Sequence, residues 1–236
     1  MKLNKGRILG FLVLGIVLLA GIFGTGRALY TWSRSADNDA RYTVVVDPGH
    51  GGIDPGKVGV NDAQEKDVNL AISMKLKEIL EKNDCKVILT RDSDAGLYQE
   101  SDSNKKMADL RARCQMIDES GADIIISIHQ NSFTAESSKG AQVFYQTTSQ
   151  EGKKLADILQ NQLISSLDTE NHRVAKANSD YYMLKNTRGT MVIVECGFLS
   201  NSQEAELLVQ EGYQRRVAWA IALGALQYLA GVRGET

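Results

Sequence analysis

The chain has 236 residues, a length that suits one sizeable domain better than two. Its formal net charge at pH 7 is −2, and because five Lys or Arg and only two Asp lie within residues 1–40, the remainder is more acidic, at −5. A mildly acidic chain without a basic stripe argues against nucleic acid as the main partner.

The N-terminus has the charge pattern of an export signal. Lys2, Lys5 and Arg7 precede an apolar run over residues 8–24, as in a secretory leader or a membrane anchor. As a helix this run would span roughly 25 Å, against ~30 Å for the hydrocarbon core, so its length leaves both options open. We expect a signal peptide or anchor over 1–29, a linker over 30–41, a folded domain over 42–230 and a tail over 231–236. The folded domain is then extracytoplasmic, either secreted or held to the membrane through residues 8–24.

Apolar periodicity predicts that strands and helices alternate along the rest of the chain. Strands are expected over residues 42–47, 86–90, 122–129, 141–146, 181–184 and 191–194. Amphipathic helices are expected over 67–83, 107–119 and 150–167, followed by one that starts at Ser202 and one over 213–229. This alternation predicts an α/β fold, with a mostly parallel twisted sheet of about six strands and helices on both faces.

Three polar side chains follow buried strands. His50 lies in a glycine-rich turn after the first strand, His129 ends the third, and Glu195 follows the last apolar run. Because open α/β sheets bind ligands at the carboxyl edge of their strands, these residues are expected to share one crevice. Glu65 leads into the next helix, and a loop that folds back over this edge would place it beside His50. The alternative for each residue taken alone is structural, such as a solvated histidine at a strand end.

Two imidazoles and one carboxylate are a ligand set typical of catalytic zinc, which keeps a fourth position for water. Magnesium or calcium would favour oxygen ligands throughout. We therefore expect His50, Glu65 and His129 to hold one zinc ion per chain. Glu195 is the candidate general base, because a carboxylate at the end of an apolar strand carries a desolvation cost that a structural role rarely justifies.

Other polar positions are weaker candidates. Arg91 could bind substrate at the same edge or form a structural ion pair, and Asn131 could contact substrate or only form a turn. Asp47 could accept the ring hydrogen of a histidine ligand. His172 lies in a polar stretch with no strand before it, which favours a solvated loop residue. The cysteines form no CxxC pair and are expected to be small buried apolar side chains (Cys85, Cys114, Cys196).

Six ordered motifs resemble those of one family. They are Asp47-Pro48-Gly49-His50-Gly51-Gly52, Glu65, Leu89-Thr90-Arg91, Leu110-Arg111 with Arg113, Ser127-Ile128-His129-Gln130-Asn131, and Glu195-Cys196-Gly197-Phe198-Leu199-Ser200-Asn201. In order and spacing the chain resembles, from about residue 42 to 229, the zinc-dependent N-acetylmuramoyl-L-alanine amidases of the amidase-3 type. The resemblance implies that His50, Glu65 and His129 bind zinc and that Glu195 is the catalytic carboxylate. It also implies hydrolysis of the amide that joins N-acetylmuramic acid to the L-alanine of the peptidoglycan stem peptide.

A second set of features looks like the spore-cortex amidases within this family. These features are the loop Gly96-Leu97-Tyr98, which leads to Asp109-Leu110-Arg111, and a single leader without wall-binding repeats. They imply work beside a deacetylase to form muramic-δ-lactam, which germination requires, in the space between the two forespore membranes. The need for an activating protein partner is left open.

Three other functions remain as alternatives. A general cell-wall or division amidase would share the chemistry. A zinc carboxypeptidase would also cleave an amide, but the chain lacks an HxxE ligand pair. A catalytically silent wall-binding partner would keep the fold, although the presence of all four site residues argues against it.

Overall fold

The computed structural model describes residues 40–232 and 234. The predicted leader over 1–29 and most of the linker over 30–41 lie outside the described residues. The first strand of the described part begins at Tyr42, and the last helix runs to Val232, two residues into the predicted tail. Within the part that the structure describes, no helix is long and apolar enough to cross a membrane.

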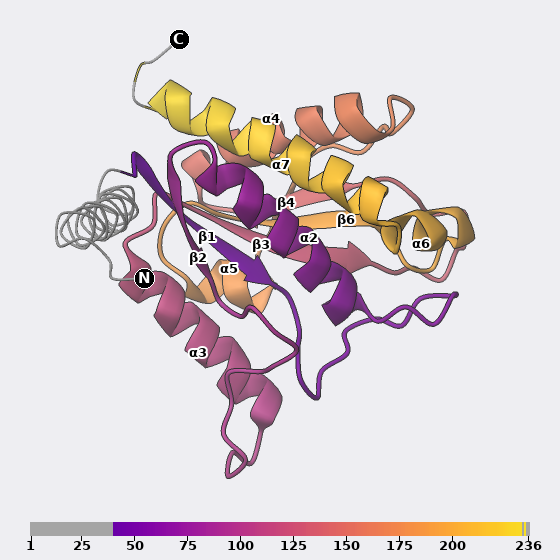
Figure 1. Ribbon diagram of the computed structural model, residues 1–236, viewed down its shortest axis with the longest axis horizontal. Coiled ribbons are helices and arrows are strands. Elements are labelled where there is room, and N and C mark those ends of the chain that lie inside the picture. Colours follow the sequence, from indigo (N-terminus) through magenta and orange to yellow (C-terminus); the bar gives the residue numbers. More distant parts are fainter. Residues whose placement is uncertain (1–39, 233, 235–236) are drawn as a thin grey trace, which may run out of the picture. The chain divides into compact units, whose positions relative to one another are not determined.

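The domain is built on a six-stranded sheet in the order β2-β1-β3-β6-β4-β5 (Figure 1). The strands are β1 (Tyr42–Pro48), β2 (Cys85–Leu89), β3 (Ile124–Asn131), β4 (Gln142–Gln146), β5 (Lys176–Asn178) and β6 (Met191–Phe198). All neighbouring pairs are parallel except β4 with β6, which is antiparallel. The prediction of a mostly parallel α/β sheet of about six strands is confirmed.

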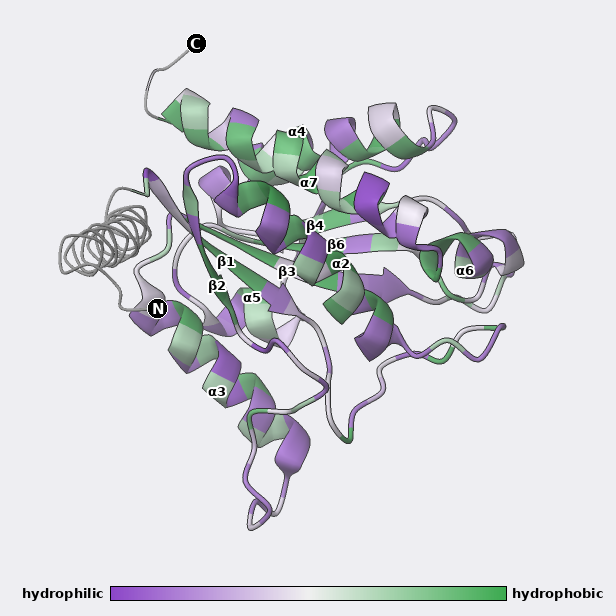
Figure 2. Cartoon of the chain, in the orientation of Figure 1, coloured by the Kyte–Doolittle hydropathy of each residue, from purple (hydrophilic) through white to green (hydrophobic). Residues whose placement is uncertain are grey.

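Helices cover both faces of this sheet. On one face lie α2 (Glu65–Glu81), α4 (Gln150–Leu167) and α7 (Glu211–Val232), and on the other lie α3 (Lys105–Ser120) and α5 (Tyr182–Asn186) (Figure 1). The short helix α6 (Ser202–Leu208) packs against α7 and β6. Figure 2 shows that the strands are mostly hydrophobic, while the helices carry both hydrophobic and hydrophilic residues.

Alternation along the strands divides the core into two clusters. In β3, Ile124 and Ile126 pack in the larger cluster, with α2, α4 and α7, whereas Ile125 packs in the smaller one, with α3 and α5. Successive side chains of a strand point to opposite faces, so a strand covered on both faces must be apolar throughout. This requirement explains why the central strands appear in the sequence as continuous runs of β-branched residues.

The prediction of a strand over 181–184 is wrong. Tyr182–Asn186 forms the helix α5, and the strand beside β4 is the three-residue β5. The Oδ1 atom of Asn178 accepts hydrogen bonds from the amides of Asp180 and Tyr181, which turns the chain out of β5 and into the helix. Because β5 is short, partly exposed and polar, it leaves no apolar signal, whereas α5 has buried residues that look like a strand.

The strands β3 and β6 run further than predicted. They end at Asn131 and Phe198 rather than at residues 129 and 194, so His129 and Glu195 lie inside them and are partners in the parallel ladder. The pairing is interrupted only after His129, where the register shifts before Asn131 pairs with Phe198. A regular ladder therefore fixes the backbones of both residues.

Candidate metal centre and active site

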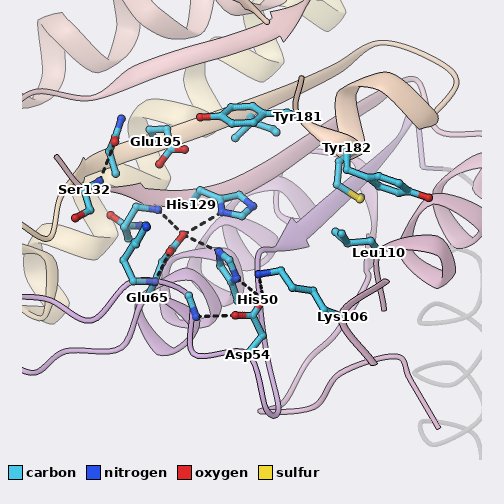
Figure 3. Close-up of a pocket in the computed structure, with 16 residues that line it drawn as sticks. His50, Asp54, Glu65, Lys106, Leu110, His129, Ser132, Tyr181, Tyr182 and Glu195 are labelled. Carbon is cyan, nitrogen blue, oxygen red and sulfur yellow. Dashed lines mark hydrogen bonds and ion pairs between the residues drawn. The ribbon is translucent and has the colours of Figure 1, made fainter. Parts of the chain in front are cut away.

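A cavity of about 450 Å³ opens at the carboxyl ends of β1, β3 and β6 (Figure 3). Five of the residues singled out from the sequence line it together, namely His50, Glu65, His129, Asn131 and Glu195. Two lysines and two tyrosines complete much of the wall (Lys57, Lys106, Tyr181, Tyr182). The expectation that distant segments meet in one crevice therefore agrees with the geometry.

Three potential metal ligands converge in this cavity. The Glu65 Oε1 atom lies 3.2 Å from His50 Nε2 and 3.0 Å from His129 Nδ1. One ligand atom from each residue lies within 4.8 Å of the others. Two atoms that share one zinc ion at about 2.1 Å are at most about 4.2 Å apart, so Glu65 is at coordinating separation from each imidazole. Two nitrogens and one carboxylate oxygen match the donor set of catalytic zinc.

Glycines make this convergence possible. A Cβ on Gly49 would collide with the His129 ring, and a Cβ on Gly56 would lie 2.5 Å from Glu65 Oε2 and 2.7 Å from His50 Cδ2. His50 itself has a φ of 63°, a left-handed conformation that is uncommon for a residue with a side chain. The loop therefore brings its backbone against the ligand side chains and holds His50 in a strained geometry, as functional sites often do.

Asp54 fixes the orientation of the His50 ring, and sequence reasoning missed it. Its Oδ2 atom lies 2.9 Å from His50 Nδ1 and 3.0 Å from Lys106 Nζ. Burial acts to raise the pKa of Asp54, but the hydrogen bonds with His50 and Lys106 outweigh it and hold the pKa at about 2. An ionised carboxylate on Nδ1 favours the tautomer that presents a free Nε2 toward Glu65. The signal that could have found Asp54 is its place four residues after His50 in the same turn.

Glu65 is an anchored anion. Its Oε2 atom accepts a hydrogen bond from the Lys57 amide at 2.8 Å, and its Oε1 atom accepts one from the Gln130 amide at 3.1 Å. Burial acts to raise the pKa of Glu65, but hydrogen bonds with His129 and His50 outweigh it and place the pKa well below its usual range. For His129, burial acts to lower the pKa and the Glu65 contact raises it overall. Glu65 therefore remains ionised and fixed in place, as a metal ligand would have to be.

Glu195 is buried beside this group without being part of it. Its side chain faces the cavity from β6 (Figure 3), and its Oε2 atom has no hydrogen-bond partner among the residues that the structure describes. Burial raises the pKa of Glu195 to about 7, although the neighbouring His129 acts in the opposite direction. A carboxyl group with a pKa near neutrality is suited to accept a proton and return it.

Asp47 holds the site through a different partner from the predicted one. Instead of a histidine ring, its carboxylate accepts hydrogen bonds from Arg113 Nη1 at 2.7 Å, Thr90 Oγ1 at 2.6 Å and Ser127 Oγ at 2.6 Å. Arg113 also donates from Nη2 to the main-chain carbonyl of His50 at 2.6 Å. Burial acts to raise the pKa of Asp47, but Arg113 and the two hydroxyls hold it at about 2.

The remaining candidates are placed as follows. Arg91 does not line the cavity, and its guanidinium donates to the carbonyls of Pro48, Gly49, Lys66 and Ser93. These contacts favour a structural role, and substrate binding by Arg91 stays a prediction. The Oδ1 atom of Asn131 accepts a hydrogen bond from the Ser132 amide at 2.8 Å, and contact of Asn131 with substrate stays a prediction. His172 is exposed, and the three cysteines are buried and free.

Comparison with known proteins places this geometry in one family. The family model described as N-acetylmuramoyl-L-alanine amidase matches residues 44–227. The germination-specific N-acetylmuramoyl-L-alanine amidase of Bacillus subtilis is 36% identical over 224 residues, which cover 94% of this chain and 92% of the relative. The amidase AmiA of Escherichia coli is 28% identical over 238 residues, with 83% of this chain and 78% of the relative covered.

A solved structure agrees with these relatives. The CwlD amidase of Clostridioides difficile, in complex with the GerS lipoprotein, superposes with a TM-score of 0.79 at 41% identity, covering 81% of this chain and all of that one. The resemblance of the six sequence motifs to this family is confirmed. The chain belongs to the amidase-3 family of N-acetylmuramoyl-L-alanine amidases.

Proposed function

We propose that this chain is a zinc hydrolase that cleaves the amide between the lactyl group of N-acetylmuramic acid and the L-alanine of the stem peptide. The observation that carries the proposal is the convergence of His50 Nε2, Glu65 Oε1 and His129 Nδ1 in a cavity whose wall includes Glu195. The donor set fits zinc, and contacts from outside the set orient two of the three side chains, His50 and Glu65. In the chain as described, these three side chains are the only metal-ligating cluster of three or more.

The reaction needs a proton carrier, and Glu195 fits this role. Bound zinc would supply Lewis-acid chemistry, activating a water molecule and polarising the scissile carbonyl. Glu195 accepts the proton of the attacking water on its carboxylate and then donates it to the leaving alanine nitrogen, so the amine departs neutral. Its burial in β6 raises its pKa to about 7, which suits both halves of this cycle.

The surrounding contacts hold the catalytic groups before substrate arrives. Asp54 orients the His50 ring, and the amides of Lys57 and Gln130 fix the two oxygens of Glu65. Because these groups need little rearrangement during the reaction, the site is preorganised for the charge that develops on the substrate. Asn131 lines the same cavity, which supports the proposal that its amide contacts the substrate.

We also propose a setting in the spore cortex. The Bacillus subtilis relative is named germination-specific, and the Clostridioides difficile structure is a complex with a lipoprotein. By analogy, this chain acts outside the cytoplasmic membrane on cortex peptidoglycan, between the two forespore membranes. It prepares muramic acid for a deacetylase that leads to muramic-δ-lactam, and a protein partner assists it.

The bond cleaved can be identified by mass spectrometry. The full chain, purified with zinc, is incubated with stem-peptide-bearing peptidoglycan, and the fragments are then released with a muramidase. Intact free stem peptides together with unsubstituted muramic acid would support the proposal. Shortened stem peptides would identify a carboxypeptidase, and an unchanged profile, also after addition of a sporulating-cell membrane extract, would identify a silent binder.

A further inference from the structure

The carboxylate of Glu195 presents an incomplete set of contacts. Its Oε2 atom is buried, and within residues 40–232 and 234 no hydrogen bond satisfies it. A buried carboxylate oxygen without a donor costs free energy, and its side chain has less to hold it in one orientation. A proton carrier in this reaction must nevertheless present one oxygen toward the attacking water. Some group in the cavity wall is therefore expected to hold the other oxygen.

Tyr181 is the side chain best placed for this task. It lines the same cavity, and Figure 3 shows its hydroxyl directed toward the Glu195 carboxylate from the segment that precedes α5. Its amide donates to Asn178 Oδ1 at 2.8 Å, and its ring packs edge-on against Phe144 with centroids 5.4 Å apart. The first contact fixes the main chain of Tyr181, and the second fixes its ring. The hydroxyl therefore approaches Glu195 from a rigid support.

The electrostatics agree with a hydrogen bond donated by the tyrosine. Burial, and after it the charge of Glu195, raises the pKa of Tyr181 to about 12. The hydroxyl therefore keeps its proton at neutral pH and can donate it in a hydrogen bond. Burial is the main cause that raises the pKa of Glu195, and the Tyr181 hydroxyl acts to lower it. Hydrogen bonds to a charged acceptor are stronger than those between neutral groups.

We propose that Tyr181 is a positioning residue for the general base, its hydroxyl holding one oxygen of Glu195 so that the other faces the reacting water. The inference rests on the proposed function and adds to it a residue that acts through Glu195. Removing the hydroxyl leaves the three metal-ligand side chains untouched. The defect should therefore fall on turnover and leave zinc binding in place.

The neighbouring tyrosine provides a matched control. Tyr182 also lines the cavity, but Figure 3 shows its hydroxyl pointing away from Glu195, past Leu110. Tyr181→Phe and Tyr182→Phe each remove one oxygen atom from adjacent positions on the same wall. A general disturbance of the cavity would affect both variants alike. An effect that runs through Glu195 would appear only in the first.

The test compares the full chain with Tyr181→Phe and Tyr182→Phe on muramidase-released muramoyl peptides. We expect kcat of Tyr181→Phe to fall by about 10- to 100-fold, since one hydrogen bond to a charged group is lost, with KM within about threefold. Zinc content and melting temperature should match those of the unaltered chain. Tyr182→Phe should stay within about twofold in kcat. In a Glu195→Gln background, Tyr181→Phe should lower the residual rate by less than about threefold.

The outcomes separate this inference from the proposed function. An unaltered chain that stays inactive also after addition of the sporulating-cell membrane extract would overturn both. An active chain whose Tyr181→Phe variant keeps full kcat would overturn the inference alone. Equal losses in the two tyrosine variants, a loss of zinc from Tyr181→Phe, or the full loss repeated in the Glu195→Gln background would also overturn it, because each shows a structural effect.

Discussion

Replacing Arg113 by methionine tests how the buried charge cluster supports the metal site. Arg113 and Asp47 are 2% and 1% exposed, and their closest atoms are 2.7 Å apart. Arg113→Met would leave the Asp47 carboxylate buried with only the hydroxyls of Thr90 and Ser127 as partners. Removing one member of a buried ion pair typically costs about 3–5 kcal/mol. At about 2–4 °C per kcal/mol for a domain of this size, the melting temperature should fall by roughly 6–20 °C.

The same change should weaken zinc binding, because Arg113 also holds the His50 carbonyl from its Nη2 atom. The assay is thermal unfolding with and without zinc, together with zinc titration by calorimetry. Arg111→Met is the matched control, since Arg111 is exposed on the same helix and should change the free energy of unfolding by less than about 0.5 kcal/mol. The double variant Arg113→Met with Asp47→Asn should recover part of the loss, because no uncompensated charge remains. A loss below about 1 kcal/mol, or one equal to that of the control, would refute the reasoning.

Other predictions concern the ligands, the base and the response to acid. Glu195→Gln should retain zinc, and its turnover should fall by about 10²- to 10⁴-fold. His129→Ala should lose both zinc and turnover. Stoichiometric zinc in His129→Ala would contradict the ligand set. Asp54→Asn should weaken zinc binding by about 10- to 100-fold in a calorimetric titration, and the same effect from the exposed Asp92→Asn would contradict the role given to Asp54. Because the pKa of Asp47 is depressed to about 2 from an ordinary value near 3.8, its stabilising contribution is present above about pH 4 and is lost as pH falls toward 2. Denaturant unfolding should show a loss of about 1.8 kcal/mol between pH 4 and pH 2, which Asp47→Asn should abolish, and an unchanged slope in the variant would argue against this cause.

The sequence predicted the residues that line the site better than the residues that hold them in place. His50 and His129 were found because parallel strands bring their carboxyl ends to one edge, and that rule requires no knowledge of side-chain contacts. Arg113 was missed as a support of His50 because the residues that it holds lie more than sixty positions earlier in the chain. Such pairs appear only after the fold has brought them together. The local pattern of apolar residues predicts the strands, whereas the hydrogen-bond partners of a polar side chain depend on tertiary contacts.

The error over residues 181–184 has a related cause. Met183 and Leu184 are buried, so the segment has the hydrophobic content of a strand. A run of four residues is too short to separate a period of 2 from one of 3.6. The side chain of Asn178 decided the outcome by accepting two amides and starting a turn. The turn placed Tyr181 on the cavity wall, where no strand pattern would have put it.

The antiparallel direction of β4 brings the connection between β3 and β4 to the entrance of the cavity. Because β4 runs antiparallel to β6, with Gln142 opposite Glu195, the connection over residues 132–141 starts and ends beside the cavity that Glu195 lines. A parallel strand in its place would have required a crossover to the far edge. Residues inserted in this connection would lie over the entrance of the cavity. The strand pairing and the side chains that line the site would keep their positions. A change in the length of this one segment can thus alter access to the cavity without moving the residues of the site.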